Sequence, residues 1–348
     1  MKNKKLNIGI LFIALALVLY FTLKDDFNGI IKELSSVNIW IFLMAIIVFL
    51  ASLLFKSASL KTFLCEHNSC YTLKNAYQLT LIGQFLNGIT PFQSGGQPFQ
   101  IYLLKKDGIR ISDSTNAMIK DFIAYQAALI IVGTASLLLN LKLDLFSNNV
   151  YLNGFIFLGF FINLVVMTLL LFVVLAKKAG ISIANKIVHF IFKFKVVRKF
   201  GTTEEKIKES IKNFYKTGAS IKDNKKNLIK GIIYNIINLT LLYLVPFVVF
   251  KALGVKNINA ISSIVATSFV MLISNFIPIP GATGGIEYSF MQFFKGFTGG
   301  AVLAGAMLLW RFITYFMAMI TGFIALMFKR RVDKDENRII YWYISTIY

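Results

Sequence analysis

The sequence predicts an all-α, polytopic membrane protein with six transmembrane helices plus two re-entrant helical hairpins, arranged in two inverted repeats. The composition is the first observation: 57% of the 348 residues are hydrophobic and only 15% are charged, whereas soluble domains average about 25% charged residues. The second is that the apolar residues form runs of roughly 17 to 28 residues, which is long enough for a helix to cross a bilayer. The third is a break made of proline and paired glycine that occurs in two of these runs, 189 positions apart.

Six apolar runs are predicted to cross the membrane as unbroken helices. They lie at about residues 6–23, 39–55, 114–139, 151–175, 228–250 and 301–328. The first run resembles a signal peptide, but no small-residue cleavage site follows it, so it is interpreted as an anchoring helix. The segment 177–230 carries 15 Lys and Arg against 4 Asp and Glu, a net charge of +11. The positive-inside rule therefore places this segment, and with it both termini, in the cytoplasm.

Two further apolar segments are predicted to enter the membrane and turn back. The first, 77–104, is broken from Pro91 to Pro98, and the second, 258–297, is broken between Pro278 and Gly285. Proline and paired glycine interrupt a helix, and each arm of the first segment is too short to cross a bilayer. The second segment could instead be one complete span followed by a short half-helix, and that alternative stays open.

The two breaks indicate an internal repeat. An offset of 189 residues places Pro91 on Pro280 and the pair Gly95-Gly96 on Gly284-Gly285. Each half has three spans and one hairpin, and since three is odd, the halves must be inverted relative to each other. The predicted repeats are 1–140 with hairpin 77–104, and 141–348 with the basic loop 177–230 and hairpin 258–297. Chance similarity is the alternative, but a matched pair of broken helices is a good pointer to a transport site.

Backbone and charged groups near the breaks are the candidate substrate contacts. Helix N-termini after the glycine pairs would present N–H groups to an anion. Charges are unfavourable within a membrane unless they are paired or face a cavity. The expected pairs are Arg311 with Glu287, and Lys120 with Asp121 or with substrate, although Lys120 could instead extend to the lipid headgroups. The candidate substrate-binding residues are Gln93, Gly95, Gly96, Gln97, Lys120, Asp121, Gly284, Gly285, Glu287 and Arg311.

The sequence lacks the motifs of common enzymes. It contains no G-x-S-x-G, P-loop or HExxH pattern, and its longest segment outside the predicted membrane helices has only about 50 residues. No catalytic residue, cofactor or metal site is predicted, and transport driven by ATP hydrolysis in this chain is excluded. The net charge of +21 lies between hydrophobic spans, so the membrane and not nucleic acid is the expected partner. Assembly into a homo-oligomer stays open.

The two breaks resemble a known family. Residues 90–104 read TPFQSGGQPFQIYLL and residues 278–287 read PIPGATGGIE. These segments are similar to the paired signatures of the lysylphosphatidylglycerol synthase transmembrane (flippase-like) family, over about residues 5–330. In larger members of that family, a soluble domain transfers lysine from charged tRNA to phosphatidylglycerol, and the flippase half moves the product outward and protects against cationic peptides. This sequence carries no such transferase domain, so the resemblance implies a stand-alone membrane domain.

The expected function is that of a lipid flippase in a bacterial inner membrane. Its substrate would be an aminoacyl-phospholipid or a related phosphate-bearing lipid. Helix N-termini and Arg311 are expected to hold phosphate, while Glu287 and Asp121 would hold a cationic part of the headgroup. One alternative is a phosphatidylglycerol lysyltransferase-type protein of aminoacyl-phospholipid synthesis, linked to cationic-peptide resistance. Another is a scaffold whose basic loop recruits a cytoplasmic partner.

Overall fold

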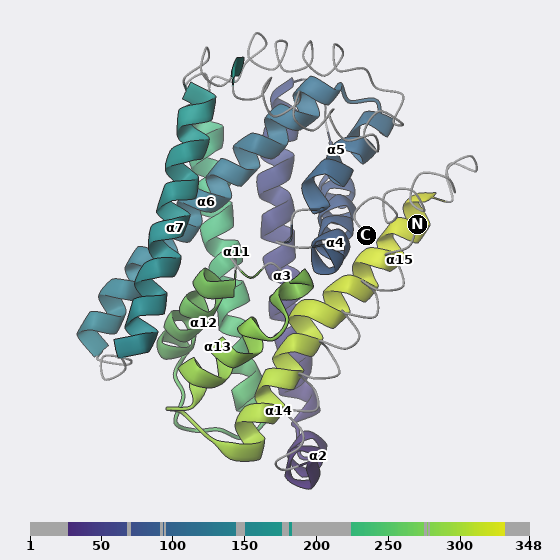
Figure 1. Cartoon of the computed structure of the whole chain (residues 1–348). Coiled ribbons are helices and arrows are strands. Elements are labelled where there is room, and N and C mark those ends of the chain that lie inside the picture. The colour runs from purple at the N-terminus through teal and green to yellow at the C-terminus, as the bar shows by residue number, and fades with distance from the viewer. Residues whose placement is uncertain are drawn as a thin grey trace, which may run out of the picture.

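The computed structural model is a bundle of helices (Figure 1). It describes residues 27–67, 71–90, 93, 95–143, 150–175, 181–182, 224–274, 277 and 279–330, and this part of the chain contains no strand. The predicted all-α class is therefore confirmed for the described residues. The predicted span 6–23, most of the basic loop 177–230 and the C-terminal tail lie outside them.

The helices follow the predicted order along the chain. They are α2 (Phe27–Ser35), α3 (Ile39–Leu64), η1 (Cys65–His67), α4 (Leu73–Ile89), α5 (Gly96–Lys106), α6 (Ile111–Leu143), α7 (Val150–Leu175), α11 (Lys225–Ala252), α12 (Ala260–Ser274), η3 (Pro280–Ala282), α13 (Gly285–Phe294), α14 (Gly300–Arg311), η4 (Phe312–Met317) and α15 (Ala318–Arg330). Four helical stretches are long and apolar enough to cross a membrane: Ile39–Leu64, Ile111–Lys142, Lys225–Ala252 and Gly300–Lys329. They coincide with four of the six predicted spans, and α7 occupies the place of a fifth.

Two long helices, α3 and α11, pack along each other in the middle of the bundle. α3 begins at Ile39 and α11 at Lys225, and the two make the most extensive contact between any pair of elements in the described part of the chain. Asn38 caps α3 by accepting hydrogen bonds from two backbone N–H groups of its first turn, which satisfies donors that a helix N-terminus leaves without partners. α6 packs against both helices.

The two predicted hairpins are pairs of short helices that occupy different halves of the bundle. α4 and α5 lie in the upper half of Figure 1, and α12 and α13 lie in the lower half. The longest of the four, α4, has 17 residues, or about 26 Å as a helix, which is less than the roughly 30 Å of a hydrocarbon core. α4 also contacts η3, the turn inside the second break. The two breaks therefore meet inside the protein.

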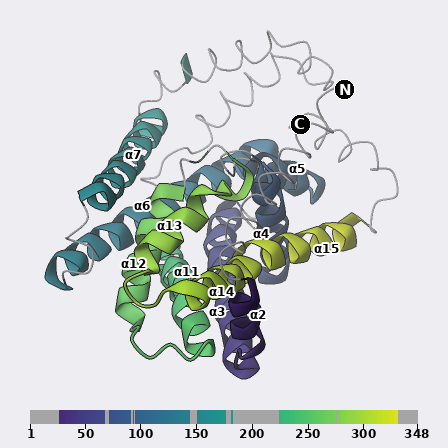
Figure 2. The same ribbon diagram turned by 60° about the horizontal axis from the view of Figure 1, so that its bottom comes forward.

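The last long helix passes beside the first hairpin. α15 packs along α4 in both views (Figure 1; Figure 2). A side chain at Gly322 of α15 would collide with the backbone carbonyl of Leu81 on α4. Glycine at this position is what allows the two backbones to approach so closely.

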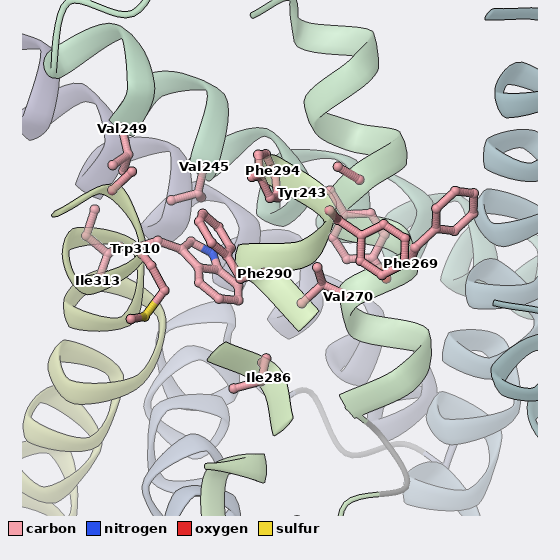
Figure 3. Close-up of a cluster of buried hydrophobic side chains, with 14 of the residues drawn as sticks. Tyr243, Val245, Val249, Phe269, Val270, Ile286, Phe290, Phe294, Trp310 and Ile313 are labelled. Atoms are coloured by element: carbon pink, nitrogen blue, oxygen red, sulfur yellow. The ribbon is translucent and has the colours of Figure 1, made fainter. Parts of the chain in front are cut away.

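An aromatic cluster fixes the second hairpin against its neighbours (Figure 3). The ring of Phe290 on α13 stacks on Phe294 with a centroid distance of 4.3 Å and on Trp310 of α14 at 4.7 Å. The rings of Phe290 and Trp310 are fully buried. Such stacked pairs add roughly 0.5–1.5 kcal/mol to the burial of their area. The cluster thereby holds α13 beside the end of α14, where Arg311 directly follows Trp310.

Candidate functional site

A cavity of about 380 Å³ with both polar and apolar lining residues lies where the two breaks meet. Gln93 and Gln97 of the first break line it, and so do Gly281 and Ile286 of the second. The rest of its wall comes from α3, α4, α6, α7, α11, α12 and the junction of α14 with η4. Its polar lining residues are Ser52, Lys56, Gln84, Asn87, Gln93, Gln97, Tyr125, Gln126, Asn163, Asn238, Arg311, Thr314 and Tyr315. A cavity of this size can hold a small polar group.

The first break is stabilised by side chains of its own hairpin. The N–H of Gly95 donates to Oγ1 of Thr90 over 2.9 Å, and the N–H of Gly96 donates to Oδ1 of Asn87 over 2.8 Å. An ideal Cβ on Gly96 would lie 2.5 Å from that same Oδ1, so only glycine fits. The N–H groups of Gly95 and Gly96 are therefore satisfied within this segment, as buried backbone donors usually are.

The second break has an unusual backbone. Gly281 and Gly284 have φ values of 62° and 92°, and Ala282 has a φ of 53°. Glycine adopts positive φ readily, but for alanine it is strained. The N–H of Gly284 donates to Oε2 of Glu287 over 2.6 Å. A side chain at Gly285 would collide with Ile277, so this pair of glycines also forms the turn itself.

Arg311 and Glu287 form a buried ion pair, as the sequence predicts. Nε of Arg311 lies 2.7 Å from Oε1 of Glu287, and each residue is only 6% exposed. Nη2 of Arg311 donates to the carbonyl of Gly281 over 3.1 Å, and the guanidinium lies 4.3 Å from the ring centroid of Tyr315. Arg311 lines the cavity, while Glu287 is not among the lining residues that the structure describes.

A π-helical segment follows Arg311 directly. It covers Phe312–Met317 and contains two cavity residues, Thr314 and Tyr315. The hydroxyl of Tyr315 donates to the carbonyl of Gly88 in the first hairpin over 3.0 Å. One helical turn therefore contacts both hairpins, through Arg311 on one side and Tyr315 on the other. Such π-helical turns often occur at functional sites.

A second ion pair contributes a cation to the cavity wall. Nζ of Lys56 on α3 lies 2.7 Å from Oδ2 of Asp121 on α6, and 4.8 Å from the ring centroid of Tyr125. The other carboxylate oxygen of Asp121 accepts a hydrogen bond of 2.6 Å from Ser59. The sequence reasoning missed Lys56, because the predicted span ended at Phe55 whereas α3 continues to Leu64. The signal that could have found it was Asp121 itself, since a carboxylate within a membrane helix needs a cation nearby.

The expected pairing of Lys120 with Asp121 is wrong. Nζ of Lys120 lies 2.6 Å from Oε2 of Glu66, whose other oxygen accepts from Asn227 over 3.0 Å. Adjacent residues of a helix point about 100° apart, so they face different neighbours. Lys120 does not appear among the described residues that line the cavity.

A further polar cluster joins the first hairpin to the last helix. Asp107, which follows α5, accepts from the hydroxyl of Tyr71 over 2.5 Å and pairs with Lys329 of α15 over 2.7 Å. Burial and the neighbouring Asp107 carboxylate raise the pKa of Tyr71 well above its ordinary value. Tyr71 therefore stays a hydrogen-bond donor throughout the range of pH at which the protein would work.

The ten candidate residues thus divide into four groups by position. Gln93, Gln97 and Arg311 line the cavity. Gly95, Gly96, Gly284 and Gly285 form the two breaks, while Glu287 and Asp121 bind cations that line the cavity. Lys120 belongs to a separate ion pair.

The chain is similar to known membrane proteins over nearly its full length. Residues 7–322 match the family model described as the Lysylphosphatidylglycerol synthase TM region. The chain is also 26% identical over 351 residues to UPF0104 membrane protein MJ1595 of Methanocaldococcus jannaschii, and this match covers 96% of each chain.

Proposed function

The chain belongs to the family of the Lysylphosphatidylglycerol synthase TM region, and from this premise we propose that it is a flippase that moves a phosphate-bearing lipid between leaflets. One observation carries the proposal: the cavity between the two hairpins, with Arg311 in its wall. Membership of this family indicates a membrane protein, and the long apolar helices indicate the same independently. The cavity adds a place where a headgroup could be shielded from the hydrocarbon.

The cavity stands out against its surroundings. The helices around it expose many large apolar side chains, including Phe157, Phe161 and Leu169 of α7, which suits contact with lipid tails. A charged side chain at the centre of a membrane helix costs about 2.5–3.5 kcal/mol on insertion scales. A buried Arg311 and a partly buried Lys56 at one cavity are therefore a costly arrangement, and such residues usually serve a substrate path.

Arg311 is suited to bind a phosphate. A guanidinium has five N–H donors, and the contacts that Arg311 makes with the described residues use Nε and Nη2. Its plane is held by Glu287 and by the ring of Tyr315. A guanidinium held in this way presents the donor pair that phosphate oxygens accept in a bidentate geometry.

The proposed cycle moves the headgroup through the cavity while the acyl tails remain in the bilayer. The two repeats, 1–140 and 141–348, would alternate in opening the cavity to one side, as in other transporters with inverted repeats. Supporting this, the hairpins occupy opposite halves of the bundle and meet at their breaks. Net movement requires different affinities for the lipid in the two states. We place the protein in a bacterial inner membrane, with both termini on the cytoplasmic side because of the basic segment 177–230.

The test is translocation in liposomes that contain the purified protein and a tail-labelled phosphatidylglycerol, with accessible label quenched from outside. We expect wild type to move the lipid and the double variant Arg311→Gln/Glu287→Gln to slow it at least tenfold, because the variant removes the phosphate contact without leaving a buried charge. A matched control, Arg110→Gln/Asp113→Asn, removes an ion pair outside the cavity. Lysine transfer from charged tRNA by the same protein, without translocation, would favour the synthase alternative and contradict the proposal.

A further inference from the structure

We infer that the transported lipid has an anionic headgroup whose remaining part is neutral and rich in hydroxyls, such as a glycerol or sugar phosphate, and that lipids bearing an ammonium group are poor substrates. The inference rests on the proposed function and narrows its substrate. It departs from the expectation that Glu287 and Asp121 bind a cationic moiety.

The charges at the cavity are arranged asymmetrically. The cations Lys56 and Arg311 line it, but the carboxylates that pair with them do not. Among the described lining residues there is no aspartate or glutamate at all. An ammonium group entering the cavity would therefore approach two cations and find no carboxylate in the described part of the wall.

The two carboxylates that pair with these cations are already engaged with the protein. Oδ2 of Asp121 pairs with Lys56 and its Oδ1 accepts from Ser59. Oε1 of Glu287 pairs with Arg311 and its Oε2 accepts from the N–H of Gly284. Turning either carboxylate toward a ligand would break an ion pair whose carboxylate is buried, which is strongly unfavourable.

Side-chain amides are the most numerous polar groups among the described residues of the wall. Seven of them line the cavity: Gln84, Asn87, Gln93, Gln97, Gln126, Asn163 and Asn238. An amide both donates and accepts hydrogen bonds, and so does a hydroxyl group. Part of this capacity is used internally, since Asn87 accepts from Gly96 and Asn163 donates to Gly159. The remainder matches a polyol better than a second charged group.

Lipid selectivity tests the inference directly. Tail-labelled phosphatidylglycerol, lysyl-phosphatidylglycerol and phosphatidylethanolamine are compared in the same liposomes. We expect phosphatidylglycerol to move at least tenfold faster than either of the other two lipids. If lysyl-phosphatidylglycerol moves as fast as phosphatidylglycerol, the inference is overturned while the proposed flippase function stands. If no lipid moves, the proposed function is contradicted and the inference falls with it.

A designed change of selectivity provides the second test. Gln97→Glu adds a carboxylate at an exposed cavity position in the first turn of α5, where acidic side chains suit the helix N-terminus. We expect it to raise the rate for lysyl-phosphatidylglycerol relative to phosphatidylglycerol at least tenfold. Gln292→Glu is the control, since it adds the same charge on α13, outside the described cavity lining and beside Lys295.

The selectivity of these variants also tests whether the cavity wall contacts the headgroup. If Gln97→Glu misfolds, as judged by size-exclusion chromatography, Gln93→Glu at the other exposed position of the break replaces it. A selectivity ratio equal to that of wild type in a folded cavity variant would overturn the assignment of this wall to the headgroup. A shift of the same size in Gln292→Glu would also overturn it, because the effect would then not depend on the cavity.

Discussion

Nε of Arg311 lies 2.7 Å from Oε1 of Glu287, and this contact joins the last long helix to the tip of the second hairpin. Both residues are buried. Removing one partner of such a pair leaves an uncompensated charge, which costs about 3–5 kcal/mol, whereas removing both is far less damaging. The pair therefore allows stability and transport to be separated by mutation.

We expect Arg311→Gln alone to lower the thermal stability of the purified protein markedly, because Glu287 would remain buried without its cation. The double variant Arg311→Gln/Glu287→Gln should regain most of the lost stability and still translocate lipid at least tenfold more slowly than wild type. Thermal unfolding in detergent and translocation in liposomes are measured on the same preparations. A single variant as stable as wild type would contradict the burial argument.

A parallel prediction concerns the ion pair between Lys56 on α3 and Asp121 on α6. Lys56→Gln/Asp121→Asn should keep the hydrogen bond of residue 121 with Ser59 and remove one of the two cations from the cavity wall. We expect translocation of an anionic lipid to slow several-fold, with a smaller loss of stability than Lys56→Gln alone. An increased rate for the double variant would argue that Lys56 does not contact the headgroup.

Substitution of Gly281 tests how tightly the second break packs against Tyr315. The φ of this glycine is 62°, and an added side chain would collide with the ring of Tyr315. We expect Gly281→Ala to destabilise the protein by more than the roughly 1–3 kcal/mol of backbone strain alone. Gly254→Ala is the matched control, since Gly254 has a φ of 77° and open space around it. Equal losses of stability in the two variants would show that the collision with Tyr315 is unimportant.

Tyr315 connects the π-helical turn to the first hairpin. Tyr315→Phe removes the hydrogen bond to the carbonyl of Gly88 but retains the ring beside Arg311. We expect a loss of about 1 kcal/mol in stability, as for a typical buried hydrogen bond, together with slower translocation because the two hairpins are less firmly connected. Tyr288→Phe, at an exposed tyrosine of α13, should change neither quantity.

The elements that local sequence patterns determine were predicted well. The lengths of the apolar runs located four of the described spans, and the proline and glycine breaks located the four short helices. The pairing of Arg311 with Glu287 followed because both are charges within predicted membrane segments, where a charge needs a partner. These features depend on few residues close together in the sequence or on a charge that needs a partner.

The features set by tertiary packing were not predicted. The partner of Asp121 is Lys56, 65 positions earlier, because the rotation of α6 turns Asp121 toward α3 and Lys120 toward Glu66. The π-helical turn after Arg311 contains no proline or glycine that would indicate an irregular helix in the sequence. α2 forms between the predicted spans 6–23 and 39–55, with Ile30 buried and the helix packed against α14. Each of these depends on how helices dock, which periodicity alone cannot reveal.

The most direct test of the cavity as the headgroup path is to block it chemically. Thr314→Cys, in a background with Cys65 and Cys70 changed to serine, places one thiol in the cavity wall, and Tyr288→Cys in the same background places one on an exposed surface. After complete modification by a charged thiol reagent, translocation of phosphatidylglycerol should stop in the first variant and continue in the second. Undiminished translocation by fully modified Thr314→Cys would contradict the account.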